Sequence, residues 1–169
     1  MRNIAYVDVM LKSKVEKTIL KQVKKNKEIV YGAKALNKQV VGFVQRPTQD
    51  YDIYSTKPKR SARQVEKKLD KLYGFDHFYT KPAMNPGTTR VMSKGKDLDK
   101  GTRDDYNVAD YTEKPRKVRV VTIGGVKYAH VSKIKEDKVK ALMDPAYKFR
   151  HEKDKWDLER IKKTKQWRR

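Results

Sequence analysis

The sequence contains no cysteine and only three histidines among its 169 residues. Without cysteine the chain can form neither disulfides nor a thiolate metal site, and it has no cysteine nucleophile. The histidines, His77, His130 and His151, are scattered, and no two of them are three or four residues apart. We therefore expect neither a zinc site nor a catalytic serine–histidine–aspartate triad.

Long apolar runs are also missing. No stretch of the sequence approaches the length that a membrane-spanning helix requires. The N-terminus carries Arg2 but also Asp8, and it lacks the uninterrupted apolar segment of a secretory signal. The sequence therefore predicts no membrane partner and a cytoplasmic location.

Acidic residues are scarce relative to basic ones. The chain has 43 lysines and arginines against 21 aspartates and glutamates, for a net charge of +22. Such a surface attracts polyanions, which include nucleic acid, nucleotides and acidic membrane faces. A lysine-rich thermophilic surface is the alternative, but that composition normally raises glutamate together with lysine. We therefore favour a polyanionic ligand.

Apolar spacing predicts a mixed α/β chain. Leu11, Val15, Ile19 and Val23 recur every four residues and indicate a helix over residues 8–27. Further helices are expected over residues 34–41, 61–73, 132–143 and from 151 to the C-terminus. Strands are expected over residues 28–31, 50–54, 75–81 and 106–112, with a hairpin of 118–123 and 126–131 across Gly124-Gly125.

The region from Pro82 to Asn107 is rich in Pro, Gly, Asn, Asp and Lys, and we expect a mobile loop there with at most a weak strand at 90–92. The length fits one domain, over residues 1–169, with a basic tail at 162–169. The expected fold class is α/β (α+β), a small mixed sheet flanked by helices.

Two aspartates one residue apart, Asp50 and Asp52, indicate a candidate site. In a strand, residues i and i+2 point to the same face, so the two carboxylates would project together and repel each other. A divalent cation resolves this repulsion, and Mg²⁺ prefers carboxylate and phosphate oxygens. An acidic solvated turn is the alternative for an isolated pair of this kind.

Residues elsewhere give the pair a context. Gly32 stands between a short strand and a helix, where backbone N–H groups can approach a phosphate, and Lys34 adds positive charge. Asn37 lies on the same helix, and we expect it and Lys34 to bind the phosphates of a nucleotide there. Asp110 sits between apolar residues in a later strand, where it either completes a three-carboxylate cluster or protects a sheet edge from unwanted pairing.

The segments Gly32-Ala33-Lys34-Ala35-Leu36-Asn37, Asp50-Tyr51-Asp52-Ile53 and the lone Asp110 together resemble the nucleotidyltransferase superfamily of the DNA polymerase β type. The resemblance is strongest to its minimal and abortive-infection-toxin-like members, and viral poly(A) polymerase catalytic subunits are also similar. It implies that Gly32 and Ala33 line the triphosphate, and that Asp50, Asp52 and Asp110 bind two Mg²⁺ ions. Asp110 would also help to activate the acceptor hydroxyl.

The C-terminal part fits the same resemblance. Lys138 before Ala141-Leu142, followed by Lys153-Asp154 and Asp157-Leu158, is similar to a pattern of the toxin-like members. It implies that Lys138 contacts phosphate and that Lys153, Asp154 and Asp157 lie near the site. Ordinary charge pairing on a helix surface is the alternative for the last three. Ala33 departs from the family, in which glycine or serine usually follows the first glycine.

The resemblance implies a metal-dependent nucleotidyltransferase that uses an NTP and Mg²⁺ and that acts on an acceptor hydroxyl of RNA or DNA. Tyr54, Tyr79 and Tyr111 could stack on its bases, although packing in the sheet is the simpler role for them. The alternatives are a basic nucleic-acid-binding protein with weak or lost catalysis, and a metal-dependent nuclease.

Overall fold

The computed structural model of the chain describes residues 4–167, with side chains for residues 10–166. The helices are α1 (Ile4–Lys25), α2 (Gly32–Asn37), α3 (Pro58–Tyr73), α4 (Val131–Met143) and α5 (His151–Trp167), with short 3₁₀ helices η1 (Gly42–Val44) and η2 (Pro145–Arg150). The strands are β1 (Ile29–Tyr31), β2 (Tyr51–Ser55), β3 (Phe78–Pro82), β4 (Thr88–Ser93), β5 (Tyr106–Glu113), β6 (Val120–Ile123) and β7 (Val126–Ala129).

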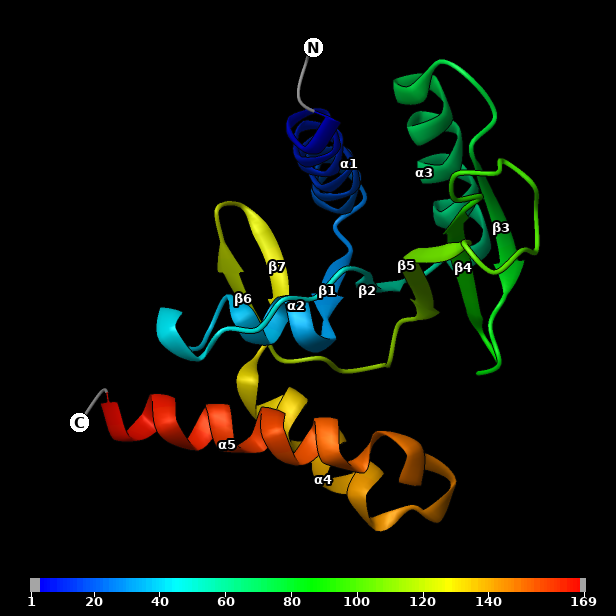
Figure 1. Ribbon diagram of the computed structural model, residues 1–169. Helices are drawn as coiled ribbons and strands as arrows, with labels where there is room; N and C mark the ends of the chain where they lie inside the picture. The colour runs from blue at the N-terminus through cyan, green and yellow to red at the C-terminus, as the bar shows by residue number, and fades with distance from the viewer. Residues whose placement is uncertain (1–3, 168–169) are drawn as a thin grey trace.

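The strands form one mixed sheet in the order β3-β4-β5-β2-β1-β7-β6. Two neighbouring pairs are parallel, β2 with β5 and β1 with β7, and the other pairs are antiparallel. Helices α1 and α3 lie on one side of the sheet, and α4 and α5 lie on the other (Figure 1). The predicted fold class, a mixed sheet flanked by helices, is confirmed.

A large part of the core lies between the sheet and the pair α1 and α3, and the same cluster extends to Leu36 of α2, Ile134 of α4 and Ile161 of α5. Ile19 and Val23, four residues apart on α1, are buried, as are Val65 and Leu69 on α3. They belong to the same apolar cluster as Ile53 of β2. This is the periodic apolar stripe that the sequence predicts for both helices. Burial of this stripe fixes the position of β2 in the sheet.

The region expected to be a mobile loop contains a full strand, β4, at the position of the weak strand expected at 90–92, while residues 94–105 contain no strand. β4 pairs with β3 as an antiparallel hairpin and with β5 on its other side. Val91 and Met92 are buried in it. Pro86 and Gly87, which suggested a loop, belong to the tight connection between β3 and β4, where Gly87 has a φ of +77°. The strand expected at 90–92 is confirmed, but it is longer than predicted, because turn residues between two strands resemble those of a longer loop.

The helix expected over residues 34–41 is also shorter than predicted. α2 begins at Gly32 and ends at Asn37. The backbone N–H of Val41 donates to Thr164 Oγ1 of α5 at 3.2 Å rather than to a helical carbonyl. The predicted basic tail continues α5 as far as Trp167, and Arg168 and Arg169 lie outside the described residues. None of the described helices has the length and apolar character needed to cross a membrane.

Candidate active site

Strand register aligns four polar side chains across the sheet. Asp52 of β2 lies opposite Tyr31 of β1 and opposite Asp110 of β5. Asp110 in turn lies opposite Arg90 of β4. Residues paired in register share one face of a sheet. Tyr31, Asp52, Asp110 and Arg90 therefore form a row on the face that carries the cleft described below.

Asp50 joins this row to complete a cluster of three carboxylates. Asp50 precedes β2 by one residue, and its Oδ2 accepts a hydrogen bond from Asn107 Nδ2 at 3.2 Å. Asp50, Asp52 and Asp110 each offer a carboxylate oxygen, and these oxygens all lie within 4.8 Å of one another. The structure thus brings together the three acids that the sequence analysis selected.

The crowding of negative charge shifts the pKa values of two of these acids. Burial, and then the neighbouring Asp50 and Asp110, raise the pKa of Asp52 to about 7, although Arg150 and Lys153 oppose the shift. Burial also raises the pKa of Asp110, against the opposing charge and hydrogen bonds of Arg90. A cation is the group that would relieve this repulsion most directly.

The donor set of the cluster suits a hard divalent cation. It offers carboxylate oxygens, which Mg²⁺ prefers as ligands. It offers neither sulfur nor imidazole, which softer metals prefer. Arg90 donates from Nε to Oδ1 of Asp110 at 3.1 Å and from Nη2 to Oδ2 at 3.4 Å. A metal that binds Asp110 therefore competes with a guanidinium that is already in place.

Gly32 lies directly against the cluster. Its φ of +66° belongs to the left-handed region, which favours glycine. A Cβ added at Gly32 would stand 2.1 Å from Oδ2 of Asp52, well inside van der Waals contact. The turn from β1 into α2 therefore reaches Asp52 only because residue 32 has no side chain.

A cleft of about 840 Å³ opens over the cluster. Its floor is formed by side chains of β1, β2, β4 and β5, and its opposite wall by α4, η2 and the start of α5. Gly32 and Ala33 line it at one end, and Lys138 and Lys153 line it from the helices. Its volume lies in the range typical of small-molecule sites, about 300–1,000 Å³.

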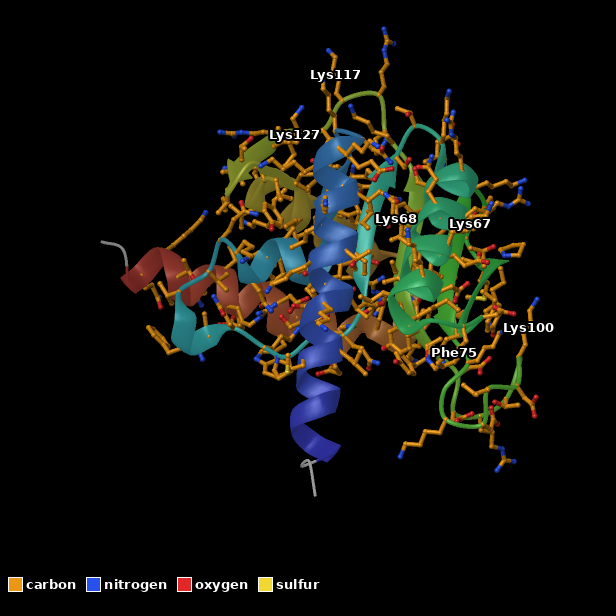
Figure 2. All side chains as sticks on the ribbon, turned by 90° about the horizontal axis from the view of Figure 1, so that it is seen from above. Lys67, Lys68, Phe75, Lys100, Lys117 and Lys127 are labelled. Carbon is orange, nitrogen blue, oxygen red and sulfur yellow. The ribbon has the colours of Figure 1, made fainter. Side chains whose placement is uncertain are left out.

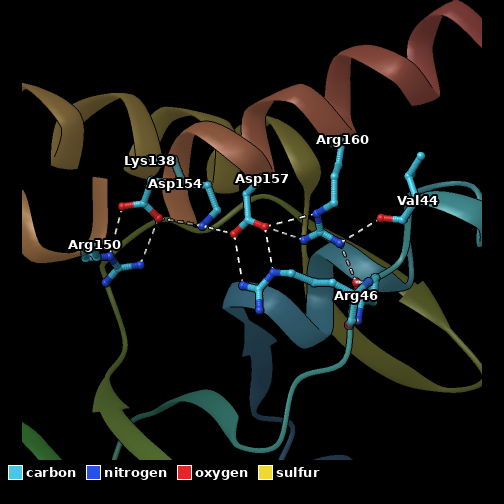
Figure 3. A network of polar contacts seen from close by, with 8 residues as sticks. Val44, Arg46, Lys138, Arg150, Asp154, Asp157 and Arg160 are labelled. Atoms are coloured by element: carbon cyan, nitrogen blue, oxygen red, sulfur yellow. Dashed lines mark hydrogen bonds and ion pairs between the residues drawn. The ribbon is translucent and has the colours of Figure 1, made fainter. Parts of the chain in front are cut away.

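A network of buried charges supports the helical wall (Figure 3). Asp154 and Asp157 of α5 are fully buried. Lys138 of α4 contacts both, at 3.0 Å to Asp154 Oδ1 and 2.6 Å to Asp157 Oδ2. Asp154 and Asp157 thus join α5 to α4. Because both are fully buried, they are not exposed surface pairs, although each also pairs with an arginine three or four residues away.

Three arginines complete the network. Arg46 donates from Nε and Nη2 to the two carboxylate oxygens of Asp157, and Arg160 donates to the same carboxylate at 2.6 Å. Arg150 donates from Nε and Nη2 to Asp154. Four cations thus surround two carboxylates, so the network carries more positive than negative charge. Arg46, Lys138 and Arg150 line the cleft and bring this excess to the candidate site.

Two residues expected to bind nucleotide have their side chains engaged elsewhere. Lys34 is paired with Glu16 of α1 at 2.5 Å and lies over the ring of Tyr51. The Asn37 amide donates to the carbonyl of Arg46 at 2.7 Å, and its Oδ1 accepts from Arg160 at 2.8 Å. Neither is among the described residues that line the cleft.

The tyrosines considered for stacking have different surroundings. Tyr54 lines the cleft and stacks on Tyr31, with ring centroids 3.9 Å apart. Tyr111 is fully buried in the core. Tyr79 donates its hydroxyl to Asp105 at 2.5 Å, on the loop that follows β4. Of the three, Tyr54 alone is placed at the candidate site.

Sequence reasoning missed Arg46, Arg90 and Arg150, which the fold brings to the cleft. Arg46 precedes Pro47 in a connector without periodicity, and Arg90 lies in a segment where we expected only a weak strand with no place in the sheet. Arg150 ends a 3₁₀ helix in a strongly basic region, where one cation does not stand out from the others. Recognition of the β3–β4 hairpin would have placed Arg90.

Comparisons with known proteins were made at the level of sequence and of structure. No protein-family model and no curated protein sequence matches the chain. The structure of the Megavirus polyadenylate synthase matches with a TM-score of 0.72 and 20% identity, covering 90% of this chain and 31% of that one. The structure of JHP933 from Helicobacter pylori matches with a TM-score of 0.59 and 18% identity, covering 86% of this chain and 62% of that one.

These similarities bear on the fold. The chain spans about a third of the length of the polyadenylate synthase, so the activity of that whole protein does not transfer with the fold. The overlap nevertheless covers 90% of this chain. The strand order, the row of acids and this structural similarity together establish that the chain has a nucleotidyltransferase-like fold.

Proposed function

We propose that the protein is a metal-dependent nucleotidyltransferase, which moves a nucleotide from an NTP to an acceptor hydroxyl on nucleic acid. The observation that carries the proposal is the register of Asp52 with Asp110, with Asp50 beside them and the Gly32 turn against Asp52. A nuclease would also use clustered carboxylates, but it has no use for the Gly32 turn. The nucleotidyltransferase-like fold supports the same conclusion.

Asp50, Asp52 and Asp110 would hold Mg²⁺. When bound, magnesium would supply positive charge for the phosphates and would lower the pKa of the acceptor hydroxyl. Loss of its proton would ready Asp52 for this role, since burial and the neighbouring Asp50 and Asp110 raise its pKa to about 7 in the metal-free protein. Asp110 would exchange its hydrogen bonds with Arg90 for the cation, and Arg90 would then be free to face the cleft.

The triphosphate would lie between the Gly32 turn and the helical wall. Gly32 and Ala33 would approach it with backbone atoms, which do not require the serine hydroxyl that Ala33 replaces. Lys153, Arg150 and Lys138 would face it with positive charge from α4, η2 and α5. Because Asp154 and Asp157 hold Lys138 and Arg150 in fixed positions, this charge is oriented before the nucleotide binds.

Lys34 and Asn37 would act on the nucleotide indirectly. Asn37 donates to the backbone carbonyl of Arg46, which lines the cleft. Asn37 also accepts from Arg160, which binds the same Asp157 carboxylate as the Arg46 side chain. Lys34 holds α2 to α1 through Glu16 and so supports the turn at Gly32. The sequence placed both residues at the phosphates, and we now assign them to positioning.

In the reaction, the acceptor oxygen would attack the α-phosphorus of the NTP. A new oxygen–phosphorus bond forms while the bond to the bridging oxygen breaks, and pyrophosphate leaves. The carboxylate of Asp110 would take up the proton of the hydroxyl. The fold similarity to a polyadenylate synthase favours RNA as the acceptor and ATP as one substrate.

The proposal is tested by incubation of the protein with labelled NTPs, Mg²⁺ and RNA or protein acceptors. We expect label on RNA with the wild type, and a loss of at least about 1,000-fold with Asp50→Asn or Asp52→Asn. Asp97→Asn is a matched control, because Asp97 belongs to an exposed cluster with Asp104 and Asp105 on the loop after β4. That variant should keep full activity.

Transfer by neither wild type nor control with any NTP would refute the proposal, as would transfer that survives Asp52→Asn. Cleavage of RNA in Mg²⁺ without NTP would point to a nuclease instead.

A second function is favoured by the pairing of Arg90 with both oxygens of Asp110. A guanidinium that keeps this position would exclude metal, and the protein would then bind nucleic acid without catalysis. This alternative predicts steep salt dependence of RNA binding, with no change in Asp52→Asn and no stabilisation by Mg²⁺.

A further inference from the structure

Fourteen exposed cations cover the helices on the side of the sheet opposite the cleft. They come from α1, from α3 and from the residues that directly flank them, and every one of them is exposed. They are Lys12, Lys14, Lys17, Lys21, Lys24, Lys25, Lys27, Lys57, Lys59, Arg60, Arg63, Lys67, Lys68 and Lys71. We call this set the basic helical face.

The two helices form one continuous surface. Gln22 of α1 donates to the carbonyl of Ser61 of α3 at 2.8 Å and accepts from Lys68 at 2.8 Å. Asn26 donates to Gln64 at 3.4 Å. Figure 2 views this side of the molecule and shows Lys67 and Lys68 on α3 beside α1. Lys127 of β7 extends the surface, because it lines a small cleft of about 350 Å³ together with Lys24 and Lys27.

The positive charge of this face is not balanced by the acids around it. Glu16 is paired with Lys34, and Asp70 accepts the backbone N–H groups of His77 and Phe78. Glu28 is buried and accepts from Ser61. Glu66 of α3 is hydrogen-bonded to Thr80 and lies in the field of Arg63, without forming an ion pair with it. None of the fourteen cations forms an ion pair with a side chain that the structure describes.

Mutual repulsion is visible within the face. Partial burial lowers the pKa of Lys68, and the positive charges of Lys25 and Lys21 lower it further, although the negative charge of Glu28 opposes the shift. The positive charge of this face is poorly compensated in the free protein, because the nearby acids form no ion pairs with it. An external polyanion would supply the missing negative charge and would gain from release of the counterions.

We infer that the basic helical face is a docking surface for the phosphate backbones of double-stranded nucleic acid, independent of the cleft. Single-stranded nucleic acid is usually held by aromatic side chains that stack on its bases. Within α3 and the described side chains of α1, no aromatic residue is exposed. Twelve of the fourteen cations are lysines, which act as point charges on phosphates, so base sequence is not read.

An anionic membrane is a poorer fit for this face. Helices that lie on membranes insert a wide apolar face among the lipids. The exposed large apolar residues here are Met10 on α1 and Phe75 just beyond α3, among the described side chains of this region. The face therefore offers charge without an apolar anchor. Duplex binding by this face is separate from the proposed transfer reaction, because it needs neither NTP nor metal.

The experiment measures binding of a labelled duplex of about 20 base pairs to the full chain by fluorescence anisotropy, in EDTA and without NTP. The test variant changes Lys21, Lys25, Lys67 and Lys71 to Gln. All four lysines are exposed, and none forms an ion pair with a side chain that the structure describes. The matched control changes Lys38, Lys135, Lys163 and Lys165 to Gln, removing the same charge from exposed positions on or near α2, α4 and α5.

We expect the test variant to lose at least about tenfold in affinity at 0.1 M salt, and the slope of log K against log salt to fall by about three. The control should change affinity less than about threefold. Circular dichroism on both variants checks that the fold is retained. Because the assay contains neither metal nor NTP, its result does not depend on whether the protein transfers nucleotides.

Three outcomes would overturn the inference. One is an equal loss of affinity in the test variant and the control. Another is tighter binding to a single strand of the same length than to the duplex. The third is stronger binding to vesicles that contain phosphatidylserine, with the same four lysines required.

Discussion

Replacement of Gly32 by alanine is expected to lower the rate of nucleotide transfer about 100-fold while leaving the fold intact. The added Cβ would stand 2.1 Å from Oδ2 of Asp52, whereas ordinary contacts begin at 3.4 Å, so the carboxylate must move by about 1 Å. A displacement of this size at a reacting centre costs about 100-fold in rate. The left-handed φ of +66° adds a backbone cost of about 1–2 kcal/mol for alanine.

Gly74→Ala separates these two effects. Gly74 follows α3 with a φ of +85°, so alanine meets the same backbone cost, but a Cβ there has nothing within 4 Å. Urea unfolding should show a loss of about 1–2 kcal/mol in both variants. The labelled-NTP assay should show a loss of about 100-fold in Gly32→Ala alone. Equal transfer rates in the two variants would refute the claim that the Gly32 turn fixes Asp52 for catalysis.

Two further predictions concern buried carboxylates. Asp157→Asn should destabilise the protein by about 3–5 kcal/mol at pH 7, because Arg46, Lys138 and Arg160 lose a buried partner. Burial raises the pKa of Asp157, but hydrogen bonds from Arg46 and Lys138 lower it overall, so this contribution is complete above about pH 4 and is lost on further acidification. Urea unfolding from pH 7 to pH 3 measures it, and Glu136→Gln, at an exposed pair, should change stability by less than about 1 kcal/mol. Asp52→Asn should instead stabilise the metal-free protein at pH 8. The pKa of Asp52 is raised to about 7, so its ionised form opposes folding at pH 8. The gain in unfolding free energy should therefore fade as the pH drops from about 7 towards 4. A gain that is constant over this range in EDTA would contradict it.

The sequence predicted the identity of the acids but not how they meet. Alternation in a strand was sufficient to align Asp50 with Asp52, and the apolar neighbours of Asp110 placed it in another strand. Their proximity depends on β2 pairing with β5 in parallel, across the whole of α3, β3 and β4. No local pattern encodes that long-range pairing, which the resemblance to a known superfamily supplied instead.

Predictions from neighbouring residues also failed where the same residue pattern occurs in two different structural settings. Pro86 and Gly87 close a two-strand hairpin, yet they read as part of a long loop. Asp154 and Asp157 have the spacing of exposed helix pairs, yet both are fully buried because Lys138 and the arginines reach them from other elements. Burial of charge is set by the partners that tertiary structure brings, and these are distant in the sequence.

The register of Asp52 with Asp110 has a consequence for how the chain finds its fold. A slip of β2 by one residue would turn Asp52 into the apolar layer beneath α1 and α3, where Ile53 is now fully buried. An unpaired carboxylate in that layer would be far more costly than the lost contacts of Ile53. The acids that we assign to chemistry therefore also penalise misaligned strand pairing during folding. Substitution of Asp52 by a small apolar residue would remove that penalty and permit alternative alignments of the sheet.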